Sequence, residues 1–231
     1  MRLAVLSDIH SNLPAFQAVL KKMSRIYFDA VWCAGDFVGY NPFPNEVIAE
    51  MKKENFFCVK GNHDWAVETS DTSWFNPEAA EAIRWTMKRI TIGNKEWLAS
   101  LPSRLEKKIG GKVVSMVHGS PADELFEYVF PEDAKEKAPE WLEKADALIL
   151  GHTHVPINLP IKVRGKRKIL LNPGAVGQPR DGDSRASFAL LDLKKMNAEI
   201  IRVRYDTALV KKKILDEGLP SWLGERLENG L

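Results

Sequence analysis

The sequence begins MRLAVLSDIH (residues 1–10), an apolar run that ends at Leu6 and is followed at once by Ser7, Asp8 and His10. Further along the chain, other apolar runs also end in short polar motifs. With the first, these are DIH at 8–10, GDFVGY at 35–40, GNHD at 61–64, HGSP at 118–121 and GHTH at 151–154. Because ligands of α/β proteins collect at the carboxyl ends of strands, we expect the motifs to converge in space.

The apolar periodicity predicts an α/β (α+β) fold in which two mixed β-sheets pack as a sandwich flanked by helices. The first part of the chain alternates helices with strands, and the second half is richer in strands; the predicted strands are 3–6, 30–34, 56–59, 113–117, 147–150, 168–171, 187–191 and 199–204. Two helical pieces are predicted between 65 and 101, a segment expected to cover or border the site. We expect residues 1–205 to form one domain, and 206–231 to add a helix and a polar tail packed on or near it.

The composition excludes several classes of protein. The chain has 231 residues, of which 45% are hydrophobic, enough for one sizeable core. Its 33 basic and 31 acidic residues give a net charge of +2, which argues against a specific nucleic-acid partner. The N-terminal apolar run is too short for a signal peptide or a membrane span, so we expect a cytoplasmic protein that does not bind membranes. Cys33 and Cys58 lie in apolar stretches and are predicted to be buried thiols.

The side chains of the motifs are those of a metal site. All the histidines of the chain fall in these motifs: His10, His63, His118, His152 and His154. Imidazole nitrogens mixed with Asp and Asn oxygens, without thiolate, suit catalytic Mn, Fe, Zn, Ni or Co. Asp8 and His10 alternate along the chain, so on an extended segment they would share one side and could chelate one ion. A carboxylate such as Asp36 can bridge two ions about 3.5 to 4 Å apart.

The ordered series DIH, GD, GNHD, a later His and GHTH resembles the calcineurin-like metallophosphoesterase superfamily, in particular its small single-domain prokaryotic phosphodiesterases. The resemblance runs from Asp8 to at least Arg185 and includes NPGAVGQPRDGDSRAS at 172–187. It implies two divalent ions, foremost Mn, one held by Asp8, His10, Asp36 and His154 and the other by Asp36, Asn62, His118 and His152. It further implies that His63 contacts the phosphate or protonates the leaving oxygen, with Asp64 orienting its imidazole.

What the resemblance implies for function is a hydrolase of small phosphodiesters, in which a hydroxide bridging the two ions attacks phosphorus in line. The alternatives are a phosphomonoesterase or nucleotide phosphatase, and a scaffold that keeps the fold without catalysis. The scaffold is disfavoured because every ligand position carries a suitable residue type. A nuclease is disfavoured because the chain has neither an added DNA-binding segment nor a basic stripe. The expected partner is a small phosphoester substrate, and a homo-oligomer stays open.

The sequence departs from the protein Ser/Thr phosphatase branch of the superfamily at its arginines. That branch has GDxVDRG as its second motif and an arginine before the third, whereas this chain has GDFVGYNP and Lys60. We therefore expect Arg180 or Arg185 to supply a guanidinium to the substrate, with Asn41 as a further candidate contact. The NPG and DGD triplets are most simply turns between strands. The seven tryptophans are expected to pack in the core or between helices rather than to stack on a ligand.

Overall fold

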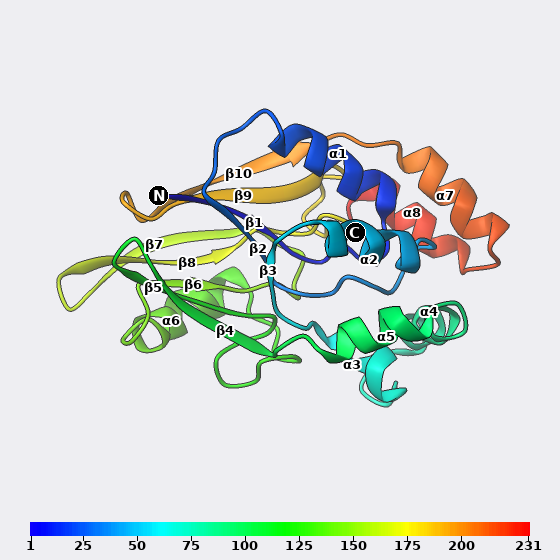
Figure 1. Cartoon of the computed structure of the whole chain (residues 1–231), viewed down its shortest axis with the longest axis horizontal. Coiled ribbons are helices and arrows are strands. Elements are labelled where there is room, and N and C mark those ends of the chain that lie inside the picture. Colours follow the sequence, from blue (N-terminus) through cyan, green and yellow to red (C-terminus); the bar gives the residue numbers. More distant parts are fainter.

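A computed structural model describes residues 1–231 and consists of two five-stranded sheets with helices on their outer faces (Figure 1). The first sheet has the order β10 (Asn197–Val203), β9 (Ala186–Asp192), β1 (Arg2–Leu6), β2 (Ala30–Cys33) and β3 (Phe57–Cys58). The second has the order β4 (Arg104–Ile109), β5 (Lys112–Val117), β6 (Ala147–Ile149), β8 (Lys166–Asn172) and β7 (Ile157–Val163). The predicted fold class, two mixed sheets flanked by helices, is confirmed.

The parallel strands explain how the motifs meet. Strands β1, β2 and β3 run parallel in one sheet, and β5, β6 and β8 run parallel in the other. The remaining strands pair antiparallel at the margins. Each of the five motifs follows the last residue of one parallel strand, namely β1, β2, β3, β5 or β6. The two sheets therefore bring their motifs to one end of the sandwich.

The strand β1 reads as one apolar run because both of its faces are buried. Leu3 and Val5 point into the layer between the sheets, where they join Met116 and Leu171. The alternate residues of β1 join the core beneath α1 (Leu13–Met23) and α2 (Pro44–Lys53), where Phe16 is fully buried. On the far side of the second sheet, α6 (Pro131–Trp141) covers its outer face.

The predicted elements did not include the edge strands β4 and β7, the helix α3 or the helix α6. The strands β4 and β7 lie at the two edges of the second sheet, and their sequences RLEKKI and INLPIKV carry charges or a proline that an edge tolerates. The helix α3 (Asn62–Thr69) begins inside the GNHD motif, so this motif is also a helix start. The helices α4 (Pro77–Met87) and α5 (Ile92–Ala99) match the two helical pieces predicted between 65 and 101.

The C-terminal segment forms two helices, α7 (Thr207–Asp216) and α8 (Ser221–Asn229). The predicted polar tail is therefore wrong, because α8 buries Leu223 and Leu227 in a cluster with Tyr40 and Ala79. The pair thus packs on α4 and on the last residue of the second motif, and Figure 1 shows α4, α7 and α8 together at one end of the sandwich. None of the helices combines the length and apolar character needed to cross a bilayer.

Candidate metal centre

The motif loops assemble a buried polar cluster between the ends of the two sheets. Its members are no more than 4% exposed: Asp8, His10, Asp36, Asn62, His118, His152 and His154. The ligand atoms of Asp8, His10 and His154 lie within 4.8 Å of one another, and so do those of Asp36, His118 and His152. The residues that the sequence singled out as metal ligands therefore lie together, in two groups.

Asp36 lies between the two groups. Its Oδ2 is 3.5 Å from Nε2 of His10 in the first group and 3.4 Å from Nε2 of His118 in the second. Its Oδ1 accepts a hydrogen bond of 2.8 Å from the backbone N–H of His63. One carboxylate oxygen is thus held by the start of α3, while the other faces both groups, the position of a bridging ligand.

Backbone carbonyls fix the orientation of the histidine rings. Three of the rings donate through Nδ1: His10 to the Val38 carbonyl (3.0 Å), His118 to the Ala34 carbonyl (2.6 Å) and His154 to the Gln178 carbonyl (2.5 Å). Nε2 of His152 donates to the Phe126 carbonyl over 3.1 Å. Because a ring nitrogen that faces a carbonyl must carry the hydrogen, the other nitrogen of each neutral ring offers a lone pair.

Acceptors consequently face one another inside the cluster. Nε2 of His10 and Nε2 of His154 are 3.0 Å apart, and Nε2 of His118 is 3.0 Å from Oδ1 of Asn62. Asp8 Oδ1 and Asp36 Oδ2 are buried without a hydrogen-bond partner. Opposed lone pairs and orphaned carboxylate oxygens are costly in a protein interior unless a cation lies between them. The chemistry of this donor set fits a pair of divalent metal ions.

The electrostatics of the cluster favour positive charge beside its carboxylates. Burial would lower the pKa of His118, but the carboxylate of Asp36 opposite outweighs it and raises this pKa to about 9, so that without a metal ion a proton on Nε2 takes the place of the cation. Burial would also raise the pKa of Asp36, yet the rings of His118 and His63 hold it well below its usual range. Asp36 is therefore an ionised carboxylate at neutral pH, as a metal ligand must be.

The ligands are presented by left-handed backbone rather than by extended chain. The φ angle is 55° at Asp8, 47° at His10, 55° at Asp36, 68° at His152 and 60° at His154. The expectation of an extended segment is wrong, because β1 ends at Leu6 and the bends that follow turn both ligands inward. Such conformations cost roughly 1–3 kcal/mol each for residues with a side chain, so the surrounding packing must hold them in place.

Asp64 performs a different task from the one predicted. Its Oδ2 accepts from the N–H groups of Asp36 (2.8 Å) and Gly61 (3.0 Å), and its Oδ1 from those of Phe37 (2.9 Å) and Val38 (3.2 Å). Both oxygens are thus occupied by backbone, and the predicted contact with the imidazole of His63 does not form. Asp64 ties the second motif loop to the third instead. Gly61 permits this close approach, because a Cβ there would lie 2.0 Å from Oδ1 of Asp36.

His63 is positioned by aromatic rings. It is buried, its Nδ1 has no hydrogen-bond partner, and burial lowers its pKa to about 4. Its ring centroid lies 4.7 Å from that of His10, 4.5 Å from Tyr40 and 5.0 Å from Phe75. His63 therefore touches the cluster as a neutral ring, and one of its ring nitrogens lies within 4.8 Å of a ring nitrogen of His10 and of a carboxylate oxygen of Asp36.

Comparison with known proteins places this arrangement in a family. The model of the calcineurin-like phosphoesterase superfamily domain matches residues 1–196. The chain belongs to this family. The metallophosphoesterase is 40% identical to the uncharacterized protein MJ0912 of Methanocaldococcus jannaschii, over 97% of this chain and 96% of the relative.

Two crystal structures extend the comparison. The metallophosphoesterase of Sphaerobacter thermophilus is 34% identical, with a TM-score of 0.84 over 100% of this chain and 99% of its own. The hypothetical protein PH1004 of Pyrococcus horikoshii shares the fold, with a TM-score of 0.90 over 100% of this chain and 98% of its own at 24% identity. The match therefore includes the C-terminal helices α7 and α8, which lie beyond the family model.

The two arginines predicted as substrate contacts of the metallophosphoesterase lie in different surroundings. Nη2 of Arg180 lies 3.2 Å from Oη of Tyr40. Burial lowers the pKa of His154, and the positive charge of Arg180 lowers this pKa further. Arg180 therefore lies beside the cluster. The side chain of Arg185 instead pairs with Asp183 on the surface, at 2.6 Å. The sequence offered both arginines as alternatives, because proximity to the last motif does not show where a turn directs a side chain.

Asn41 also has a structural rather than a substrate-facing position. It is 1% exposed, and its Nδ2 donates to the backbone carbonyl of His10 over 2.8 Å. The amide thus braces the first motif loop from behind. The structure thus gives the amide of Asn41 a bracing contact, and its contact with the substrate stays a prediction from the sequence.

Sequence reasoning missed Arg226. It lies on α8 between Leu223 and Leu227, whose side chains pack in one cluster with Tyr40. Burial and the nearby guanidinium of Arg180 lower the pKa of Arg226. The nearby Arg180 thus influences this second guanidinium, whose Nε donates to the Leu231 carbonyl over 2.7 Å. No motif marks it, since only the packing of the C-terminal helices brings it there.

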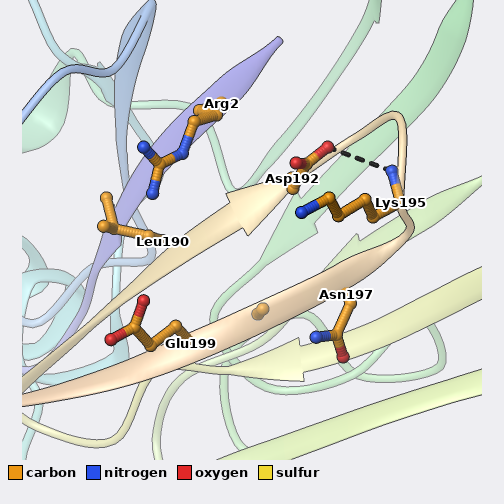
Figure 2. Close-up of a pocket in the computed structure, with 7 residues that line it drawn as sticks. Arg2, Leu190, Asp192, Lys195, Asn197 and Glu199 are labelled. Atoms are coloured by element: carbon orange, nitrogen blue, oxygen red, sulfur yellow. Dashed lines mark hydrogen bonds between the residues drawn. The ribbon is translucent and has the colours of Figure 1, made fainter.

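A surface pocket far from the motifs lacks the histidines of a metal site. It measures about 390 Å³ and lies at the opposite end of β1, which begins at Arg2. Figure 2 shows Asp192, Lys195 and Glu199 around it, with the carboxylate of Asp192 accepting from the Lys195 N–H over 3.0 Å. Opposite charges are mixed there and no histidine is present. The metal-ligand chemistry of the protein is confined to the motif end.

Proposed function

We propose that the protein hydrolyses small phosphodiesters at the buried cluster. The observation that carries this proposal is the pair of facing acceptor groups on either side of Asp36, with His63 at their edge. Two divalent ions in these groups would supply a nucleophilic hydroxide near neutral pH and neutralise charge on the phosphate oxygens. Phosphoryl transfer depends mainly on such positioning and electrostatics, which the fixed rings and carboxylates of this chain are arranged to provide.

The protein side chains around the metal ligands have separate roles in binding and hydrolysis. His63 is neutral and offers one N–H, so it donates a hydrogen bond to the phosphate or to the leaving oxygen. Tyr40 and Phe75 hold its ring in place. Arg180, which contacts Oη of Tyr40, supplies positive charge on the same side of the cluster. Asp64 keeps the loops that carry Asp36 and His63 in register.

A diester is favoured over a monoester by the supply of positive charge. The arginines of the Ser/Thr phosphatase motifs are absent, and the guanidinium of Arg180 is shared with Oε1 of Gln178 over 3.0 Å. A diester carries one negative charge and a monoester up to two at neutral pH. The lower charge therefore suits a site with few cationic side chains beyond its metal ions.

The test compares two aryl esters. Protein freed of metal by a chelator should hydrolyse bis(p-nitrophenyl) phosphate only after Mn²⁺ or another divalent ion is restored, and should prefer it to p-nitrophenyl phosphate. His63→Ala should lose turnover while elemental analysis still finds its metal. Tyr27→Ala, which changes an exposed tyrosine outside the motifs, is the control and should keep both activity and metal. Hydrolysis by metal-free protein, or full turnover by His63→Ala, would refute the proposal.

Several further features belong to the same proposal. We propose Mn as the native metal, because the donor set combines carboxylate and amide oxygens with imidazoles. A cytoplasmic location, the absence of nucleic-acid and membrane partners, and a possible homo-oligomer stay predictions from the sequence. Elemental analysis of protein purified without added metal tests the identity of the native metal, and light scattering in solution tests whether the protein forms a homo-oligomer.

A further inference from the structure

A cavity of about 310 Å³ opens beside the metal centre. Asn62, His63 and His152 form the side of the cavity toward the cluster. Aromatic side chains form most of the remaining wall, and we call them the aromatic pocket: Tyr40, Trp74, Phe75, Phe126 and Tyr128. A group attached to a phosphate at the metal centre would therefore enter a space enclosed by rings.

The walls of the aromatic pocket come from two segments that are far apart in sequence. Trp74 and Phe75 precede α4, whereas Phe126 and Tyr128 precede α6. The ring centroids of Trp74 and Phe126 are 5.8 Å apart, and the ring of Tyr128 stacks on His152 at 3.9 Å. Contacts between the two segments, and with a histidine of the cluster, thus hold the walls in place before any ligand binds.

The outer part of this wall is exposed to solvent. Trp74 is 73% exposed and Tyr128 is 50% exposed. The expectation that the tryptophans serve only for packing is thus wrong at Trp74, which lies at the mouth of the pocket. Exposed aromatic side chains beside a site with catalytic groups are typical of ligand binding, since they leave ring faces free for contact.

Size and charge limit what can occupy the aromatic pocket. Its volume lies at the lower end of the range for small-molecule sites, about 300–1,000 Å³, which suits one ring system with its linker. None of the residues that line it is Lys, Arg, Asp or Glu. Asn76 also lines it; its Oδ1 accepts from the Ala79 N–H, which leaves Nδ2 free to contact the edge of a ring. The occupant is therefore uncharged and flat, with polar atoms at its edge.

We propose that the aromatic pocket binds a planar aromatic ring of the phosphoester substrate, of the size of a nucleobase, with Trp74 and Phe126 as the main specificity-determining residues. This inference rests on the proposed phosphodiester hydrolysis. His63 lines both the cluster and the pocket, so a leaving oxygen beside His63 places its substituent among the rings. A nucleobase and a simple aryl group share this chemistry.

The experiment uses two substrates with the same leaving oxygens, the methyl ester of adenosine 5′-phosphate and the methyl ester of ribose 5-phosphate. With metal-loaded protein, the base should raise kcat/KM roughly tenfold, mainly through KM, as expected for stacking of one base. Trp74→Ala and Phe126→Ala should each reduce this advantage severalfold, and Trp74→Phe should retain most of it. Tyr27→Ala is the matched control, since Tyr27 is 72% exposed and outside the pocket, and it should keep the full advantage.

The two possible sources of the ring are separated by a third substrate, methyl p-nitrophenyl phosphate. A larger loss on this substrate than on the adenosine ester in Trp74→Ala assigns the pocket to aryl groups, and the reverse assigns it to nucleobases. Either result supports binding of a planar ring. Equal kcat/KM for the adenosine and ribose esters in the unchanged protein, or equal losses on both in Trp74→Ala and Phe126→Ala, would overturn it.

A binding measurement distinguishes this inference from the proposed function. Isothermal titration of the metal-loaded protein with adenosine 5′-phosphate and with ribose 5-phosphate should show roughly tenfold tighter binding of the former, lost in Trp74→Ala. If no ester is hydrolysed but this difference is present, the proposed function fails and the aromatic pocket stands. If both esters are hydrolysed and the two phosphates bind equally, hydrolysis stands and the pocket proposal fails.

Discussion

Replacing Asp64 by Asn tests whether this residue holds the motif loops together. The carboxylate is fully buried, and each of its oxygens accepts two backbone N–H groups, from Asp36 and Gly61 on one side and from Phe37 and Val38 on the other. An asparagine keeps one carbonyl oxygen but places an NH2 group where the second oxygen was. Two backbone donors then face another donor in a space that water does not reach.

The magnitude follows from these contacts. Each buried donor left without a partner costs about 1–3 kcal/mol, so two should lower the free energy of unfolding by about 2–6 kcal/mol. Domains of this kind are stable by about 5–15 kcal/mol, so the variant should fold with a large part of its stability lost. The loss should appear in metal-free protein, because the bonds join backbone to side chain and involve no ion.

Urea unfolding of metal-free protein, followed by circular dichroism, measures this difference. Asp71→Asn is the control with the same chemical change, because Asp71 accepts a single exposed bond of 2.8 Å from the Ser73 N–H. It should cost less than about 0.5 kcal/mol. The contrary outcome is that the free energies of unfolding of Asp64→Asn and of the unchanged protein differ by less than about 1 kcal/mol, a difference that urea unfolding can resolve. In that case, if only turnover is lost, Asp64 acts on His63 and its role in holding the loops is refuted.

Three further predictions concern the site. Asp36→Asn removes the charge that both ligand groups face, so elemental analysis should find at most one ion per chain and the metal-induced rise in Tm should shrink; an unchanged metal content would contradict the bridging position. Gly39→Ala places a Cβ 2.4 Å from Nδ1 of His63 at a φ of +93°, and displacing this ring should lower kcat roughly 10²-fold with metal content unchanged; unaltered kcat would show that the ring position does not matter. Arg180→Ala should lower kcat/KM for a phosphodiester roughly tenfold to a hundredfold, whereas Arg185→Ala should leave it unchanged; equal effects would mean that the surface pair with Asp183 does not decide the difference.

Much of the fold was predictable because it depends on local patterns. Parallel strands buried on both faces leave continuous apolar runs, and a polar motif directly after each run marks the carboxyl end of a strand. The edge strands β4 and β7 escaped because an edge buries little apolar surface and tolerates charge and Pro160. The helix α8 escaped because it is short and contains Gly224, whose missing side chain leaves room for Lys211 of α7.

The candidate site was likewise predictable only in part. Residue type and the clustering of all the histidines in the motifs were enough to indicate a metal site, whereas the division into ligands and His63 was implied by the resemblance to the metallophosphoesterase superfamily. The supporting roles were not predictable. Asp64 could equally have faced an imidazole or the backbone, and Arg180 and Arg185 are indistinguishable by sequence, because a turn decides which of them reaches the cluster.

The sequence by itself determined the sandwich of two sheets, the five motif loops and the residue types of a metal site, because each depends on short-range periodicity or on the chemistry of a side chain. Only the tertiary structure decided the left-handed backbone that turns Asp8 and His10 inward, the position of Asp36 between the ligand groups, and the aromatic pocket around Trp74. These features arise where segments distant in the chain pack against one another. A local pattern contains no record of such contacts, which are set by how the loops of both sheets fit together in space.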